Sequence, residues 1–471
     1  MIEQMNILTI MMDHIAYYNH KDVKMPNFQR LKDRGVYFPN AYCASPLCAP
    51  SRRSLFTGLY PSNHGQLTNG EKIPIKATES YFDVFMKNGY KNYYFGKCHA
   101  SSSEAISGLN GALFTDDGYG NPYGKKEYKD YINREGLPKA KMFVERNFSS
   151  EGDVMKIKEN EEYDFPRAIC ETLSGILMTP KETHESYFLA DMARRQLEEL
   201  SKSNEKFNMR VDFWGPHHPY SPTQEFINLY DEDEVELYPS FSDDLKNKPS
   251  SHKFELNKYC SKNKEIIIPN PMEEKEWKKI LTRCYGMISM CDDAMGKIID
   301  KLEELNMFEN TIVIFATDHG DAICSHGGHF DKSSYMTEEV MRIPLVIVDP
   351  KIGKKVCNEF ISNIDLAPTM LAYGGLCFSE EVDGRDIGDI FIGNNWKDTV
   401  YAQTHGHFQK WFGRMVRFGN IKYVLNKGDM NELYDLEKDP YEMNNLIDQK
   451  GYENLQNIMS EKMKDLFEKY Q

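Results

Sequence analysis

The chain has 471 residues, of which 40% are hydrophobic and 12% aromatic, so it can bury a large core and is too long for one minimal domain. Its formal net charge of −15 argues against non-specific binding to nucleic acid or an anionic membrane, although an anionic substrate could still bind in a local basic pocket. Ten cysteines without a CxxC pair indicate reduced thiols, and the sequence lacks a convincing signal peptide or membrane-spanning run, so we expect a cytoplasmic protein.

The N-terminal region predicts a buried strand followed by a helix. Asn6–Met12 is a short apolar run, typical of a strand in a parallel sheet, and Asp13 follows it directly. Residues 25–35 predict a helix, with Pro26 near its start and Gly35 at its end.

A second strand that ends at an acidic residue is predicted far along the chain. Residues 293–305 carry apolar side chains at helical spacing, and residues 311–317 then form an apolar run that ends at Asp318. Ligands of open α/β sheets bind at the carboxyl ends of the strands. We therefore expect Asp13 and Asp318 to face one site.

The remaining segments predict the outline of the fold. Residues 101–205 and 221–275 are polar and are interpreted as insertions and lids. Short strands are predicted at 399–404, 413–418 and 421–426, and a final helix at 447–470. The expected fold is α/β, with a large mixed sheet flanked by helices in residues 1–380 and a small C-terminal α+β subdomain in residues 381–471.

The strongest local motif is Cys48-Ala49-Pro50-Ser51-Arg52. Taken alone, Cys48 would be an ordinary buried thiol or half of a disulfide with Cys43. The motif and its flanks resemble the C-x-P-S-R signature of the sulfatase family. The resemblance implies an alkaline-phosphatase-like fold, and it implies a formylglycine-generating or anaerobic sulfatase-maturing enzyme that converts Cys48 to formylglycine.

Further motifs follow in the order found in that family. Gly96-Lys97-Cys98-His99 resembles its G-K-x-H motif, and Pro216-His217-His218-Pro219 resembles its P-H-x-P motif. Asp318-His319-Gly320-Asp321 with the downstream Lys332 resembles its metal-binding block. The catalytic residues that the resemblance implies are Cys48, Arg52, Lys97, His99, His217 and Lys332. The metal ligands that it implies are Asp13, Cys48, Asp318 and His319.

The resemblance also implies a role for each residue. One hydroxyl of the hydrated aldehyde at position 48 attacks sulfur, and the other then expels sulfate. Lys97 and Lys332 stabilise the sulfate oxygens. Arg52 holds the hydrate and Asp13 in place. His217 protonates the leaving oxygen, and His99 accepts the proton of the second hydroxyl.

Cys98 replaces the tryptophan that is common within the G-K-x-H motif, and two positions near the metal site also depart from the commonest family pattern. Asp13-His14 replaces a pair of aspartates, and His319 replaces an asparagine. This variant resembles choline-sulfatases and phosphonate monoester hydrolases, and His14 is interpreted as lining the site. We expect one divalent metal, with calcium first and manganese or magnesium as alternatives. Calcium prefers oxygen ligands, whereas the imidazole of His319 favours a transition metal such as manganese.

The expected activity is hydrolysis of an aryl or carbohydrate O-sulfate, on a small molecule or a saccharide. One alternative is a phosphonate or phosphate monoester or diester hydrolase that uses the same site. Another is an unmatured, non-catalytic protein that binds anions. His326 and His329 are interpreted as structural, whereas His405 and His407 are candidates to reach the site from the C-terminal subdomain.

Overall fold

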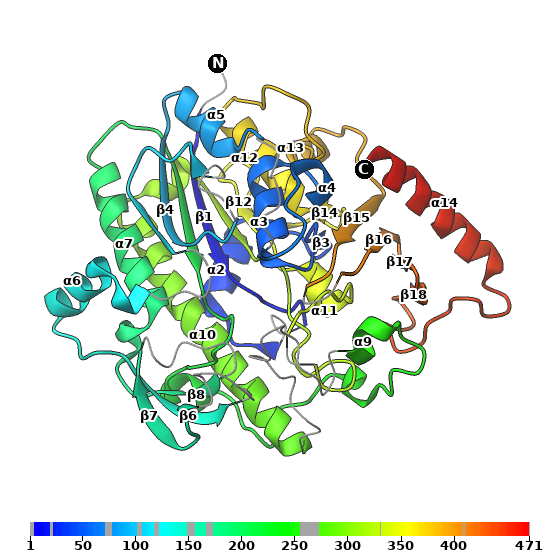
Figure 1. Cartoon of the computed structure of the whole chain (residues 1–471). Coiled ribbons are helices and arrows are strands. Elements are labelled where there is room, and N and C mark those ends of the chain that lie inside the picture. Colours follow the sequence, from blue (N-terminus) through cyan, green and yellow to red (C-terminus); the bar gives the residue numbers. More distant parts are fainter. Residues whose placement is uncertain are drawn as a thin grey trace.

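The computed structural model describes most of the chain and confirms the expected α/β architecture (Figure 1). The described residues are 4–18, 22–70, 78–100, 106–116, 122–147, 156–165, 173–254, 273–329, 331–407 and 410–470.

A mixed sheet of eight strands forms the centre of the described structure. In spatial order its strands are β13 (Lys355–Val356), β2 (Val36–Tyr37), β12 (Val346–Val348), β10 (Thr311–Ala316), β1 (Asn6–Met12), β9 (Phe207–Phe213), β4 (Lys91–Lys97) and β5 (Leu113–Asp116). Strands β10, β1, β9, β4 and β5 run parallel, whereas β12 is antiparallel to β10. The strands predicted at Asn6–Met12 and 311–317 are therefore correct, and they are direct neighbours.

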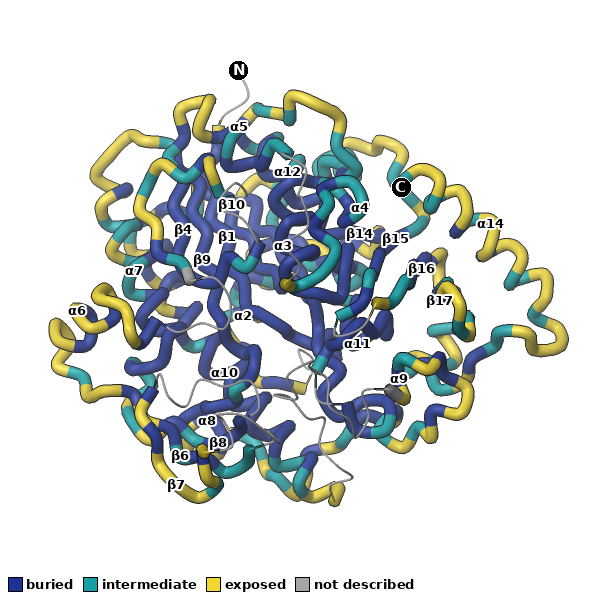
Figure 2. Tube along the Cα trace, in the orientation of Figure 1, coloured by how far each residue is buried: buried dark blue, intermediate teal, exposed yellow. Residues whose placement is uncertain are grey.

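Both faces of this sheet are covered by helices. One face packs against α2 (Pro26–Arg34), α7 (Glu185–Leu200) and α10 (Glu274–Glu304), and the other against α3 (Cys48–Thr57), α5 (Tyr81–Lys87) and α12 (Leu366–Tyr373). Alternate residues of β1 show this: Leu8 and Ile10 belong to the first core, and Ile7 and Met11 to the second. The central strands are accordingly buried (Figure 2).

The interpretation of residues 101–205 as insertions is wrong in part. Strand β5 extends the central sheet, and α7 is a covering helix. The predicted helix at 293–305 is the last part of the longer helix α10.

Smaller elements surround the main layers. They are β3 (Ala41–Tyr42), β11 (Arg342–Ile343), β14 (Ile361–Ser362), β6 (Lys141–Asn147), β7 (Glu161–Asp164), β8 (Leu173–Leu177), α4 (Pro61–His64), α6 (Lys126–Glu135), α8 (Gln224–Ile227), α9 (Ser250–Phe254), α11 (Glu338–Met341) and α13 (Gly388–Phe391).

The C-terminal region forms an antiparallel sheet with one long helix. The sheet contains β15 (Thr399–Thr404), β16 (Gly413–Phe418), β17 (Ile421–Asn426) and β18 (Glu432–Asp435), and the helix is α14 (Glu453–Lys469). Met459 and Met463 of this helix pack against Val416 and Tyr423 of the sheet. The expected α+β subdomain is therefore present, and its boundary at residue 380 stays a prediction.

No helix within the described ranges is both long enough and apolar enough to cross a lipid bilayer.

Candidate active site

Four neighbouring parallel strands end at one edge of the central sheet. Asp13 follows β1, Asp318 lies two residues beyond β10, Lys97 is the last residue of β4, and His217 lies in the loop after β9. Because parallel strands place their carboxyl ends side by side, residues far apart in sequence meet here. The prediction that Asp13 and Asp318 face one site is confirmed by their shared contacts with Arg52.

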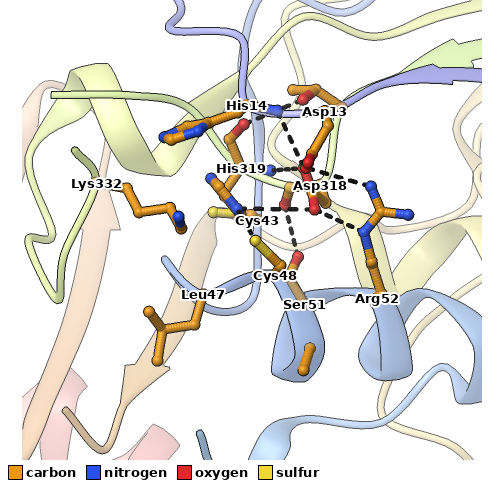
Figure 3. Close-up of polar contacts among 12 residues, drawn as sticks. Asp13, His14, Cys43, Leu47, Cys48, Ser51, Arg52, Asp318, His319 and Lys332 are labelled. Atoms are coloured by element: carbon orange, nitrogen blue, oxygen red, sulfur yellow. Dashed lines mark hydrogen bonds and ion pairs between the residues drawn. The ribbon is translucent and has the colours of Figure 1, made fainter. Parts of the chain in front are cut away.

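Cys48 is the first residue of helix α3 and is buried beneath this edge (Figure 3). Its Sγ lies 2.9 Å from Nε2 of His319 and 3.7 Å from Nζ of Lys97. Cys43 and Cys48 are both free thiols, so the disulfide alternative is wrong. A side chain at a helix N-terminus next to cations is well placed to carry negative charge.

Arg52 lies about one turn further along α3 and joins three buried carboxylates. Its Nε lies 2.8 Å from Asp318 Oδ2, its Nη2 3.3 Å from Asp13 Oδ1, and its Nη1 3.1 Å from Asp212 Oδ2. All four side chains are fully buried. This guanidinium fixes the two acidic residues that the sequence predicts as metal ligands.

Four side chains converge as a candidate metal site. The ligand atoms of Asp13, Cys48, Asp318 and His319 all lie within 4.8 Å of one another. Nδ1 of His319 lies 2.7 Å from the carbonyl oxygen of Gly320, so this nitrogen donates its N–H and Nε2 is the ring atom that would coordinate an ion. Two carboxylates and a correctly oriented imidazole fit a divalent ion, and the set does not identify which ion.

Electrostatic interactions in the site favour anionic groups at positions 13 and 48. Burial acts to raise the pKa of Asp13, but Lys97 and Arg52 outweigh it and hold that pKa below its ordinary value. Burial likewise opposes ionisation of Cys48, yet Lys332 and Lys97 hold the pKa of its thiol well below the usual range. The centre can therefore stabilise negative charge on a bound group.

Histidines line the side of the site next to β9. The His14 ring centroid lies 4.9 Å from that of His217 and 5.6 Å from that of His218. Nδ1 of His217 lies 2.8 Å from the carbonyl oxygen of His218, which leaves Nε2 of His217 for another partner. Burial, followed by the nearby His218, lowers the pKa of His217 well below its ordinary value.

The two remaining predicted catalytic residues differ in how firmly the structure ties them to Cys48. Lys332 is buried, lies 3.0 Å from Asp331, and points its amine toward Cys48 in Figure 3. His99 lies two residues after β4 and has a buried Nδ1 without a hydrogen-bond partner among the described residues. The described contacts do not join His99 to Cys48, so its catalytic role stays a prediction.

The other histidines have different surroundings. His326 lies 3.0 Å from Asp243 and 3.5 Å from Glu339 in a buried charged network. His405 contacts Arg414. Burial lowers the pKa of His407 to about 4, with smaller effects from Asp331 and Lys332, which places His407 within electrostatic reach of the site.

Sequence reasoning missed several buried polar residues around the site. They are Glu185, Arg210 and Asp212, and the partly exposed Asp331 was missed as well. Arg210 and Asp212 alternate along strand β9 and form an ion pair of 2.7 Å. A charged pair spaced by two within a strand-like segment was the available signal for Asp212.

Comparisons with known proteins match this chain to sulfatase-family sequences. The Sulfatase family profile matches residues 5–376, and the profile named N-sulphoglucosamine sulphohydrolase, C-terminal, matches residues 325–469. A protein of Escherichia coli (strain K12) described as uncharacterized sulfatase YidJ is 27% identical over 98% of this chain and 87% of its own length.

Two solved structures show the same fold. The structure of BT4656 in complex with its substrate D-glucosamine-2-N,6-O-disulfate has a TM-score of 0.74 and 16% identity, and covers 99% of this chain and 98% of that one. The phosphonate monoester hydrolase of Agrobacterium radiobacter has a TM-score of 0.77 and 20% identity, and covers 99% and 96%.

Proposed function

The chain belongs to the sulfatase family and is a sulfuric ester hydrolase, and we propose that it removes an O-sulfate from a saccharide or an aryl alcohol through formylglycine formed from Cys48. The observation that carries this proposal is the position of Cys48. Its Sγ is buried at the start of α3 beside Lys97 and His319. Conversion to formylglycine needs a maturing enzyme that recognises Cys48 to Arg52.

The hydrated aldehyde at position 48 would provide the hydroxyl that attacks sulfur. A divalent ion held by Asp13, Asp318, His319 and residue 48 would make this hydroxyl more acidic and neutralise charge on the sulfate. Arg52 keeps the two carboxylates in place through the contacts described above. Water-poor surroundings strengthen each of these interactions.

Fixed cations and histidines serve the rest of the reaction. Lys97 and Lys332 are buried and would stabilise the sulfate oxygens as charge develops. Nε2 of His217 is the atom that can exchange a proton with the leaving oxygen, since Nδ1 faces a carbonyl. His99 would accept the proton whose loss expels sulfate.

Two comparisons support a saccharide ester. The match at residues 325–469 is to a profile named after an N-sulphoglucosamine sulphohydrolase, and one structural relative was solved with a sulfated glucosamine. The phosphonate monoester hydrolase shares the fold to a similar degree. Sulfate and phosphonate esters have the same tetrahedral shape, so this second activity needs an experimental comparison.

The test compares kcat/KM on three substrates. Glucosamine 6-sulfate represents a saccharide sulfate, p-nitrophenyl sulfate an aryl sulfate, and a phenyl ester of a phosphonate the alternative activity. We expect turnover of at least one sulfate ester to exceed that of the phosphonate, and expect Cys48→Ala to lose it. A phosphonate preference would instead support the alternative. Cys48→Ala activity within about tenfold of wild type would rule out Cys48 as the nucleophile, because loss of a nucleophile costs far more.

A further inference from the structure

A second group of metal-binding side chains lies beside the first. Nε2 of His14 lies 3.3 Å from Oδ1 of Asp321 and 3.5 Å from Oδ1 of Asp331, and the three ligand atoms all lie within 4.8 Å of one another. Two ligands bound to one ion at about 2.1 Å lie at most about 4.2 Å apart, and both distances from His14 Nε2 fall within this range. His14 comes from the end of β1, and the two aspartates come from the segment after β10.

His14 carries an independent sign of a missing ligand. Its side chain is fully buried, its Nε2 faces the two aspartates, and its Nδ1 has no hydrogen-bond partner among the described residues. A buried polar group left without a partner costs about 1–3 kcal/mol. His14 also adopts a left-handed backbone with φ of 70°, which is uncommon for residues other than glycine and often marks functional sites.

This group shares no ligand with the site at Cys48. Asp13, Cys48, Asp318 and His319 form one set, whereas His14 belongs to the other. The rings of His14 and His319 are nevertheless only 4.8 Å apart, so the two sites adjoin. In Figure 3 the His14 ring points away from Cys48 and lies on the side of Lys332.

We propose that His14, Asp321 and Asp331 bind a second divalent transition metal. One imidazole nitrogen and two carboxylate oxygens suit manganese or zinc better than calcium, which prefers oxygen ligands. Nε2 of His218 lies 3.5 Å from Asp331 and is a candidate fourth ligand.

The second ion would act on the reaction through Lys332. Asp331 Oδ1 is also 3.0 Å from the Lys332 amine. An ion that fixes Asp331 would therefore position Lys332 and add positive charge near the ester. The proposal does not depend on sulfate ester hydrolysis, because ion binding can be measured without turnover.

The experiment counts Mn²⁺ ions bound at equilibrium by metal-free protein, using dialysis and elemental analysis. Wild type should bind two ions per chain, and His14→Phe, Asp321→Asn and Asp318→Asn should each bind one. Glu185→Gln is the matched control and should bind two, because Glu185 is an equally buried carboxyl outside both groups.

The single ion retained by each variant also shows that the variant is folded. One ion in wild type would overturn the proposal. It would also be overturned if His14→Phe and Asp321→Asn kept two ions, or if either lost both. Two ions in a protein whose Cys48 has been converted to formylglycine but which lacks sulfatase activity would uphold the second site while rejecting the proposed function.

Discussion

Replacement of Arg52 by methionine tests the electrostatic design of the site. Arg52 is fully buried and faces Asp13, Asp212 and Asp318 at 2.8–3.3 Å. Methionine has a similar volume but leaves the three carboxylates without their shared cation. Removal of one partner from a buried ion pair costs about 3–5 kcal/mol, so we expect Arg52→Met to lower the free energy of unfolding by about this amount.

The loss of free energy can be converted to a shift in Tm. An unfolding entropy of about 2.1 cal/mol/K per residue, over 471 residues, amounts to about 1 kcal/mol/K. Arg52→Met should therefore lower Tm by about 3–5 °C. The scan should be made with a chelator present, because a bound divalent ion would supply some of the missing positive charge.

Arg30→Met provides the matched control. Arg30 also faces two carboxylates, Asp300 at 2.8 Å and Glu303 at 3.0 Å, but its side chain is 33% exposed. Surface pairs contribute about 0–1 kcal/mol, so its Tm should change by about 1 °C or less. If Arg52→Met changed Tm no more than Arg30→Met, the claim that Arg52 neutralises the buried carboxylates would be refuted.

Three further predictions concern catalysis, pH and packing. His217→Ala should slow hydrolysis of unactivated sulfate esters by about 100-fold or more and of p-nitrophenyl sulfate much less, because only the former need a proton; equal losses would remove His217 from the acid role. Burial raises the pKa of Glu185 to about 8 in the folded protein, so wild type should lose stability as pH rises from about 4.5 to 8, whereas Glu185→Gln should not. The Tm of the variant minus the Tm of wild type should therefore be larger at pH 9 than at pH 5. A Tm difference that stays the same at both pH values would contradict this. Gly96→Ala places its Cβ 1.8 Å from the carbonyl oxygen of Asp212 and should lower the free energy of unfolding by more than about 3 kcal/mol. Gly89→Ala is the control, because Gly89 also has positive φ but open space around it, and this variant should lose about 1 kcal/mol. Thermal unfolding measures both.

The strands that consist mainly of buried apolar residues could be predicted from the sequence. Asn6–Met12 and the run at 311–317 are continuous apolar strands that end at acids, so their position in the sheet and the site at their ends could be inferred. The strands at Thr399–Thr404, Gly413–Phe418 and Ile421–Asn426 were also predicted with correct bounds.

Strands β4 and β9 could not be predicted in the same way, because polar residues are buried within them. Asn208 Nδ2 lies 2.8 Å from Asn92 Oδ1, and Arg210 pairs with Asp212 at 2.7 Å. Each polar group is satisfied by a partner that is distant in sequence or on the same strand, which only the folded sheet reveals.

The directions in which the side chains of Asp13 and His14 point after strand β1 also could not be predicted from the sequence. Asp13 and His14 are adjacent, yet Asp13 faces Arg52 and Lys97 whereas His14 faces Asp321 and Asp331. The left-handed backbone at His14 separates them, and a non-glycine residue gives no clear signal for that conformation.

The most direct test of the account is the mass of the peptide that contains Cys48, measured together with sulfatase activity on the same samples. Protein made with increasing amounts of a formylglycine-generating enzyme would supply a series with different degrees of conversion. We predict that a growing fraction of the peptide carries an aldehyde in place of the thiol, and that activity on sulfate esters rises in proportion to that fraction. Full activity in protein whose Cys48 remains a thiol would contradict the account.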